Sequence, residues 1–211
     1  PEDPAPPASV PAAPPASQVS APSQVSAPKK CALLVGLNYR NTAYELYGCI
    51  NDVYNMEKYL KTRRGFTSVT ILTDDTVTKP TRSAILAALD ALVASGNPGD
   101  TLVFQYSGHG TQTPDKNGEE ADGLDEEIVP LDFNCITDDE LRAIFAKARA
   151  GVNILVLLDS CHSGSCVDLK YSYLDDKQTQ NSLPDLAANV VLISGCKDSQ
   201  TSADAYIGGV S

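Results

Sequence analysis

This sequence of 211 residues lacks long apolar runs, clustered basic residues and paired cysteines. No apolar stretch approaches the length of a membrane-spanning helix, and the charged and apolar segments of a signal peptide are absent. Only 16 Lys and Arg stand against 27 Asp and Glu, which gives a formal net charge of −11. The pairs Lys29-Lys30 and Arg63-Arg64 are too small to form a basic patch. We therefore expect neither nucleic acid nor an anionic membrane as a partner, whereas a basic peptide or a metal ion would suit the acidity.

The cysteines are scattered, and no CxxC pair occurs among them. A chain of this length can bury a core without a disulfide framework, so we interpret the cysteines as reduced thiols. This interpretation places the protein in the cytoplasm, where we expect a monomer. The six residues are Cys31, Cys49, Cys135, Cys161, Cys166 and Cys196.

Residues 1–28 consist almost entirely of Pro, Ala, Ser, Val and Gln. Such a segment buries too little apolar surface to offset its ordering entropy, so we predict a disordered leader or linker with polyproline II character. It could serve as a simple spacer or as a docking arm for a proline-recognising domain. The composition changes at residue 29, and we predict that residues 29–211 form one domain.

Apolar runs predict five strands, and helical periodicity predicts three helices between them. The capping-box pattern from Thr137 to Glu140 marks the start of the third helix, which we expect to run to about Ala150. This alternation predicts an α/β fold, a sandwich with a mostly parallel central sheet and helices on both faces. The strands are Cys31–Leu37, Ser68–Leu72, Leu102–Tyr106, Asn153–Leu158 and Asn189–Ser194; the first two helices are Asn51–Lys61 and one with Pro80 in its first turn that ends at Gly96.

Two of the predicted strands stop abruptly at a reactive side chain. One is followed by Ser107-Gly108-His109-Gly110 (the His box), the other by Asp159-Ser160-Cys161-His162-Ser163-Gly164 (the Cys box). Catalytic groups in open α/β sheets collect at the carboxyl ends of the strands. A thiol at one strand end and an imidazole at another indicate a cysteine nucleophile and its base.

These two boxes resemble those of the caspase-like clan, and the Cys box resembles that of a type I metacaspase. The interval from His109 to Cys161 is similar to the spacing of about 50 residues in caspases, although the Gln-Ala-Cys signature of true caspases is absent. The resemblance extends from about Lys29 to Asp204 and implies a caspase-like three-layer fold, with the Pro-rich leader as prodomain. Because the chain stops where such a fold would enter its small-subunit region, we expect a fragment.

The catalytic pair follows from elementary chemistry. A thiol with a pKa near 8.5 needs a neighbouring imidazole to become a thiolate at neutral pH. We assign Cys161 as nucleophile and His109 as base, because His162 should point away from the thiol if side chains alternate near the strand end. The resemblance implies that the backbone N–H groups of Cys161 and Gly110 are the oxyanion donors, and a glycine allows the backbone to approach a substrate.

Alternation also bears on specificity. Residues two apart share a face of a strand, so we expect Asp159 on the side of Cys161 and Ser107 on the side of His109. A carboxylate beside the nucleophile would pair with Arg or Lys and repel an acidic substrate residue, although Asp159 could instead merely orient its loop.

The resemblance implies two further residues in the pocket for the residue before the scissile bond. They are Cys49 and Asp52, whose spacing places both on one helix face. The alternative is simple helix capping by Asn51 or Asp52.

Acidic residues between and after the boxes supply many hard oxygen ligands, as calcium requires, but solvated acidic loops are commoner. The resemblance implies a Ca²⁺ site formed by Asp125, Asp138, Asp139 and Asp168. A zinc site from Cys161, His162 and Cys166 fits poorly, because one short turn supplies too few separated ligands.

The leading hypothesis is a calcium-dependent cysteine endopeptidase, a metacaspase-like hydrolase that cleaves protein or peptide substrates after Arg or Lys through a Cys-His dyad. A caspase-like preference for acidic residues is disfavoured by Asp52 and Asp159. The non-enzymatic alternative is an inactive or precursor module that acts by protein interaction through its Pro-rich arm. We also predict self-processing between Cys166 and Leu186, after Lys170 or Lys177.

Overall fold

The computed structural model of the protein describes residues 27–115, 123–161, 163, 166–174, 177–180 and 182–195. The predicted Pro-rich leader of residues 1–28 lies almost wholly outside the described residues, as do His162 and Cys196. The interpretation of the cysteines as thiols holds within the described part of the chain, where five cysteines lie outside any disulfide.

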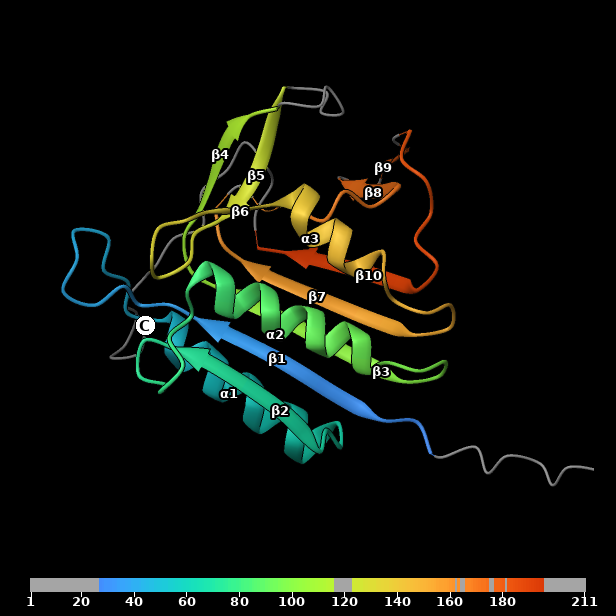
Figure 1. Ribbon diagram of the computed structural model, residues 1–211, viewed down its shortest axis with the longest axis horizontal. Helices are drawn as coiled ribbons and strands as arrows, with labels where there is room; N and C mark the ends of the chain where they lie inside the picture. The colour runs from blue at the N-terminus through green and yellow to red at the C-terminus, as the bar shows by residue number, and fades with distance from the viewer. Residues whose placement is uncertain are drawn as a thin grey trace, which may run out of the picture.

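The core of the fold is a five-stranded sheet in the order β10-β7-β3-β1-β2 (Figure 1). All neighbouring strands are parallel, so their carboxyl ends lie along one edge. The five strands predicted from apolar runs are therefore confirmed, and so is the mostly parallel sheet. They are β1 (Lys30–Gly36), β2 (Ser68–Thr73), β3 (Thr101–Ser107), β7 (Asn153–Asp159) and β10 (Asn189–Ser194).

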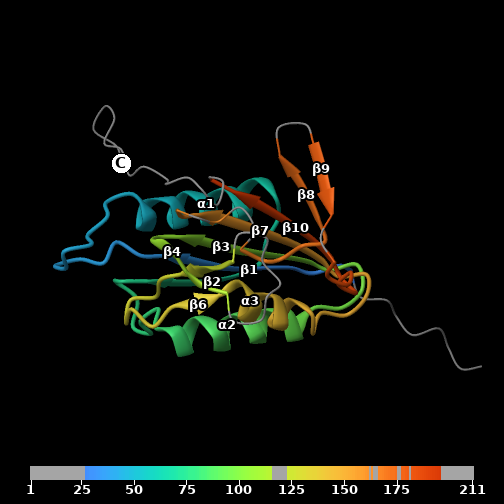
Figure 2. The ribbon, with the colours of Figure 1, turned by 90° about the horizontal axis from the view of Figure 1, so that it is seen from above.

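Helices cover both faces of the sheet, as predicted. Figure 2 shows α1 (Cys49–Arg63) on one side and α2 (Arg82–Ser95) with α3 (Asp138–Phe145) on the other. Two apolar clusters fill the layers. The smaller one lies under α1 and the larger one under α2 and α3.

Side chains of β3 alternate between these two clusters. Phe104 and Tyr106 belong to the α2–α3 cluster, whereas Val103 belongs to the α1 cluster. Ser107 continues the second set, because its hydroxyl reaches Asp52 of α1. The last residue of β3 therefore faces α1.

The predicted helix boundaries need three corrections. Pro80 precedes the N-cap residue Thr81 instead of lying in the first turn of α2, and the Thr81 hydroxyl accepts from Ala84 N–H (3.4 Å). The helix α3 has the predicted capping box but ends at Phe145, because the chain must turn back into β7. The turn is completed by Gly151, whose φ of 81° favours glycine. The helix α1 begins at Cys49, earlier than predicted.

Two small antiparallel sheets stand where the sequence predicted only polar loops. One contains β4 (Gly110–Pro114), β5 (Leu124–Ile128) and β6 (Ile136–Thr137). The other is a hairpin of β8 (Tyr171–Leu174) and β9 (Lys177–Gln180). Their sequences resemble those of loops because none of these strands contains a continuous apolar run.

The strand order reverses direction between β1 and β3, since the chain runs from β1 outward to β2 and then returns past β1. Ligands in open α/β sheets bind at such a switch point, outside the carboxyl ends of the strands. The loop from β1 to α1 and the His box meet at this place. Among the described helices, none is long and apolar enough to cross a membrane.

Candidate active site

The two boxes lie against each other at the carboxyl edge of the sheet. The strands β3 and β7 are neighbours, with Ser107 opposite Asp159 at their ends. The N–H of Gly108 donates to the carbonyl oxygen of Asp159 (3.2 Å). A Cβ atom built on Gly110 would lie 2.0 Å from the carbonyl oxygen of Cys161. Only glycine allows this approach, so the fold brings the predicted catalytic boxes into backbone contact.

Two buried tyrosines hold the backbone of His109 from both sides. The Tyr39 hydroxyl accepts from His109 N–H (2.9 Å), and the Tyr106 hydroxyl donates to the His109 carbonyl (2.8 Å). The two hydroxyl oxygens are 3.0 Å apart, and both side chains are fully buried. A Cβ atom on Gly108 would lie 2.7 Å from one hydroxyl and 2.8 Å from the other. The glycine of the His box therefore makes room for the tyrosine pair.

This tyrosine pair remains protonated at any working pH. Burial raises the pKa of both hydroxyls; hydrogen bonds to Tyr106 and His109 oppose part of the rise for Tyr39, whereas for Tyr106 the hydrogen bond with Tyr39 adds to it. The Tyr39 hydroxyl also contacts the Val129 carbonyl (2.6 Å). Sequence reasoning missed both residues. The signal that could have found them is a tyrosine just after the first strand together with one three residues before His109.

The imidazole of His109 is oriented by the loop that follows β1. Its ring packs on Tyr39, with centroids 4.8 Å apart. Its Nε2 atom lies 2.8 Å from the carbonyl oxygen of Tyr44. Because a carbonyl only accepts hydrogen bonds, Nε2 carries a proton. The other nitrogen, Nδ1, is then the one that can exchange a proton with the thiol or the substrate.

The alternation argument does not extend past the strand ends. The strands stop at Ser107 and Asp159, and bends follow at Gly108 and Ser160. Consequently Ser107 reaches α1 while the His109 ring packs on Tyr39 of the opposite cluster. The two side chains thus have different neighbours, and the expectation that they share a side stays a prediction. The corresponding expectation for His162 concerns a residue outside the described part of the chain.

The predicted specificity residues gather on the α1 side. The Ser107 hydroxyl donates to the Asp52 carboxylate (3.1 Å), and Asp159 is the register partner of Ser107. Cys49 is buried one turn before Asp52. The N-cap of α1 is Gly48 without a side-chain cap, so neither form of the capping alternative occurs.

The predicted oxyanion donors lie at the contact between the boxes. Gly110 pairs with Ile128, and Val129 N–H donates to the His109 carbonyl (3.1 Å). In an antiparallel ladder this pattern makes Gly110 a non-hydrogen-bonded position, whose N–H points away from the partner strand. That N–H therefore faces away from β5.

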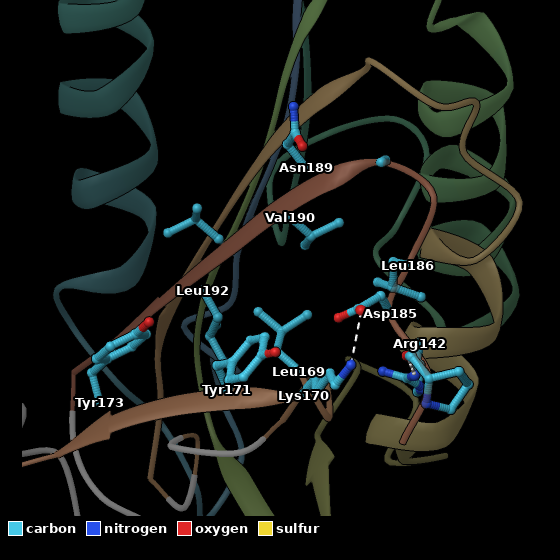
Figure 3. A pocket seen from close by; sticks show the side chains of 13 residues that line it. Arg142, Leu169, Lys170, Tyr171, Tyr173, Asp185, Leu186, Asn189, Val190 and Leu192 are labelled. Carbon is cyan, nitrogen blue, oxygen red and sulfur yellow. Dashed lines mark hydrogen bonds and ion pairs between the residues drawn. The ribbon is translucent and has the colours of Figure 1, made fainter. Parts of the chain in front are cut away.

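A cavity of about 430 Å³ lies between β8, β10 and residues 184–188 (Figure 3). None of the predicted site residues lines it. Its wall includes an ion pair between Lys170 and Asp185 (2.8 Å) and the guanidinium of Arg142. This guanidinium donates to the carbonyls of Asp168 and Pro184. The cavity is thus separate from the boxes, and Arg142 ties α3 to both ends of the segment that carries the β8–β9 hairpin.

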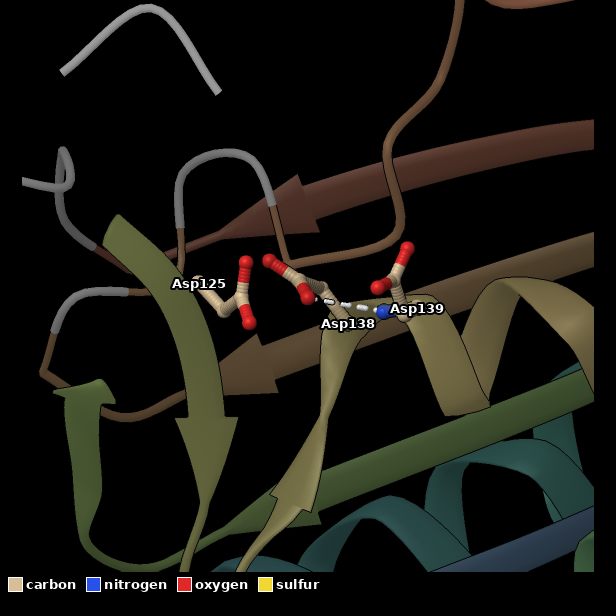
Figure 4. Close-up of side chains that lie close together, drawn as sticks. All are labelled: Asp125, Asp138 and Asp139. Atoms are coloured by element: carbon tan, nitrogen blue, oxygen red, sulfur yellow. Dashed lines mark hydrogen bonds between the residues drawn. The ribbon is translucent and has the colours of Figure 1, made fainter. Parts of the chain in front are cut away.

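Carboxylates at the start of α3 meet one from β5 (Figure 4). Asp125, Asp138 and Asp139 each offer an oxygen, and these atoms lie within 4.8 Å of one another. Asp125 and Asp138 are buried. Three oxygen ligands with two buried charges fit a hard cation such as calcium, and not zinc.

Asp138 is the most constrained member of this carboxylate cluster. It accepts from the N–H groups of Glu126 (2.8 Å) and Asp139 (2.7 Å). Burial raises its pKa to about 8, the two N–H donors oppose the rise, and the charges of Glu126 and Asp125 add to it. A bound cation would remove this cost. Asp168, the fourth predicted ligand, is buried but is not part of the cluster; its carbonyl is held by Arg142.

Comparison with known proteins agrees with this geometry. Residues 29–170 match the metacaspase, peptidase C14 domain. The chain is 38% identical to metacaspase-1A of Aspergillus fumigatus, over 86% of this chain and 58% of the relative. It is 47% identical to metacaspase-1A of Aspergillus niger, over 69% of this chain and 38% of the relative.

A solved structure supports the fold assignment. The crystal structure of a protein from Geobacter sulfurreducens superposes with a TM-score of 0.65 at 33% identity, covering 87% of this chain and 77% of that chain. The chain spans less than two thirds of the length of the two fungal relatives. The predicted type I metacaspase resemblance and the caspase-like sandwich are confirmed. With its His and Cys boxes joined at the edge of such a sheet, this chain belongs to the metacaspase family.

Proposed function

We propose that the protein is a cysteine endopeptidase that cleaves after Arg or Lys and depends on calcium. The observation that carries the proposal is the backbone contact between Gly110 and Cys161, which joins the His box to the Cys box. This contact supports a nucleophile and a base that act on the same bond. Family membership supports the same reaction class.

In the proposed mechanism, His109 and Cys161 exist as an imidazolium and a thiolate before attack. The thiolate sulfur attacks the carbonyl carbon of the peptide bond. The carbonyl oxygen then gains negative charge near the N–H groups of Gly110 and Cys161. The carbon–nitrogen bond then breaks, and Nδ1 of His109 gives its proton to the leaving amine. Water, deprotonated by the same nitrogen, attacks the thioester carbon; the carbon–sulfur bond breaks, the acid product leaves, and the thiolate and imidazolium are restored.

The preference for basic residues is supported by the acidic side chains on the α1 side. Asp52 is held by Ser107 (3.1 Å), and Asp159 stands at the next strand end. A guanidinium or ammonium group in this place would form charge-assisted hydrogen bonds, and an acidic residue would be repelled. Cys49 is the buried neighbour of this pocket on α1.

The calcium dependence is supported by the carboxylate cluster of Asp125, Asp138 and Asp139. These residues would hold the ion, and Asp168, buried in the segment after the Cys box, would be the fourth ligand. A bound ion supplies positive charge that lets the buried carboxylates ionise together. Asp125 of the cluster lies on β5, which pairs with β4 directly after His109. An ion that fixes the carboxylate cluster would thus also fix the position of the His box.

The proposal includes a cytoplasmic monomer. Its support is the scattered cysteine pattern without a CxxC pair, which suits a reducing compartment.

Profiling on quenched peptides with Arg, Lys, Asp or Ala before the scissile bond tests the specificity. We expect cleavage after Arg and Lys, with kcat/KM for Arg peptides falling by roughly 10- to 100-fold in Asp52→Asn, since one charge-assisted bond is lost. The matched control is Asp90→Asn, which removes an exposed carboxylate of α2 that pairs with Lys147. A preference for Asp, or equal rates in Asp52→Asn and the wild type, would contradict the pocket assignment.

A further inference from the structure

Two aromatic side chains are exposed beside the imidazole of His109. Tyr44 is 61% exposed and Phe133 is 45% exposed. Their ring centroids are 5.7 Å apart, and the Tyr44 ring stands nearly perpendicular to the imidazole at 6.3 Å. The Phe133 ring also packs on the buried ring of Tyr39, at 5.9 Å. Together, Tyr44 and Phe133 form an apolar surface, here called the aromatic ledge, next to the catalytic base.

The backbone at Phe133 is held in an unfavourable conformation. Its φ is 58°, in the left-handed region that bulky side chains rarely adopt. The turn is fixed by the N–H of Phe133, which donates to the Pro130 carbonyl (2.9 Å). The carboxylate of Asp132 accepts from the first N–H of α2, that of Arg82 (3.0 Å). Strained residues that the surroundings fix in this way cluster at ligand sites. The ring is thus presented by an anchored turn.

The aromatic ledge and the acidic pocket, which is the place beside Asp52 and Asp159 proposed for the basic side chain, contact different layers of the fold. Ser107 and Asp52 face the α1 layer. Tyr39, on which Phe133 packs, belongs to the cluster under α2 and α3. His109 follows Ser107 in the chain and its ring packs on Tyr39, so the imidazole adjoins both layers. A peptide whose basic side chain enters the acidic pocket would continue past His109 toward the aromatic ledge.

We infer that the aromatic ledge binds the side chain of the residue directly after the scissile bond, and that it favours an aromatic or large aliphatic side chain there. This inference rests on the proposed peptidase function, because it needs the basic residue to be bound on the α1 side. The imidazole that protonates the leaving amine must adjoin the residue carrying that amine. Rings at 5.7 Å from each other can pack a third ring in offset or edge-on contact.

The experiment uses the absence of tryptophan from the protein. The catalytically dead variant Cys161→Ala is titrated, in calcium chloride, with a peptide that has Arg before and Trp after the scissile bond. Fluorescence from the peptide then reports its own burial without background from the protein. We expect a blue shift on binding. A non-fluorescent peptide with Phe in place of Trp should compete about tenfold better than one with Gly, since a half-buried aromatic side chain gains that much.

Two variants in the same background locate the effect. Phe133→Asn removes the ring but keeps a residue that tolerates the left-handed conformation. Tyr44→Ala removes the other ring but keeps the carbonyl that accepts from His109. Each should abolish most of the preference for Phe over Gly, while Phe133→Tyr should retain it. The control is Tyr59→Ala on α1, which removes a side chain that is 48% exposed but lies outside the aromatic ledge.

The outcomes separate the two proposals. If Phe and Gly peptides compete equally while an Ala-for-Arg peptide fails to bind, the aromatic ledge is refuted and the basic pocket stands. If no peptide binds, or binding ignores the Arg, the proposed function fails and the inference fails with it. If either ring variant folds with an unchanged preference for Phe, that ring is not part of the subsite; unchanged preference in both refutes it.

Discussion

Removing one oxygen atom from Tyr39 tests the role assigned to the buried tyrosine pair. In Tyr39→Phe the ring that packs on His109 and Phe133 remains, and only the hydroxyl is lost. This hydroxyl accepts from His109 N–H (2.9 Å) and contacts the Val129 carbonyl (2.6 Å). The substitution therefore leaves the backbone N–H of His109 without its acceptor.

The two tyrosines should differ in their effects. A buried donor without a partner costs about 1–3 kcal/mol, which is the expected loss of unfolding free energy for Tyr39→Phe. In Tyr106→Phe, the His109 carbonyl keeps a hydrogen bond from Val129 N–H (3.1 Å). Its cost should therefore be that of one lost hydrogen bond, about 0.5–1.5 kcal/mol.

Activity should respond more strongly than stability in Tyr39→Phe. A displaced His109 reduces kcat by up to about a hundredfold because proton transfer depends on alignment, while KM changes little. Urea denaturation and initial rates on an Arg peptide measure both quantities, with Tyr59→Phe on the exposed face of α1 as control. If Tyr106→Phe proved the more harmful, or if Tyr39→Phe changed KM alone, the positioning role would be wrong.

Three other predictions concern the reaction, the ion and self-cleavage. Cys161→Ala and His109→Ala should each abolish peptidase activity, whereas His162→Ala should retain most of it in rate assays; the opposite result for the two histidines would overturn the choice of base. Calorimetric titration of Cys161→Ala with calcium should show binding that Asp138→Ala removes and the surface control Asp90→Asn does not; no binding at millimolar calcium would sink the cluster as a calcium site. Mass spectrometry of the calcium-treated chain should find a cut after the exposed Lys177 and not after Lys170, which pairs with Asp185 (2.8 Å); a single cut after Lys170 would be inconsistent with this protection.

The sequence was most informative where apolar runs end at reactive residues. The strands that end at Ser107 and Asp159 are buried and parallel. Their existence and their ends could therefore be predicted from hydrophobicity alone. The topology then makes these ends neighbours. By contrast, β4 and β5 carry Gln, Thr, Asp and Glu, and they form strands because they pair at the edge of the fold. Local sequence does not encode such pairing.

The predicted site was incomplete for a related reason. Tyr39 and Tyr106 are distant in sequence, and their role depends on the 3.0 Å contact between their hydroxyls. Phe133 acquires its place through a left-handed backbone that no pattern of apolar residues reveals. The carboxylate cluster shows a further limit. Adjacent aspartates could be found from the acidic pattern, but the meeting of Asp125 with Asp138 and Asp139 needed the path of the chain.

The contacts of Arg142 imply that the two fragments of a cleaved chain would stay associated. Its guanidinium holds the carbonyl of Asp168 before the β8–β9 hairpin and that of Pro184 after it. The strand β10 also stays paired along β7, from Asn189 opposite Asn153 to Ser194 opposite Leu158. A cut at Lys177 would therefore produce two polypeptides. They would elute together under native conditions and dissociate only in denaturant. Cleavage would change the freedom of the hairpin near the Cys box without releasing either piece.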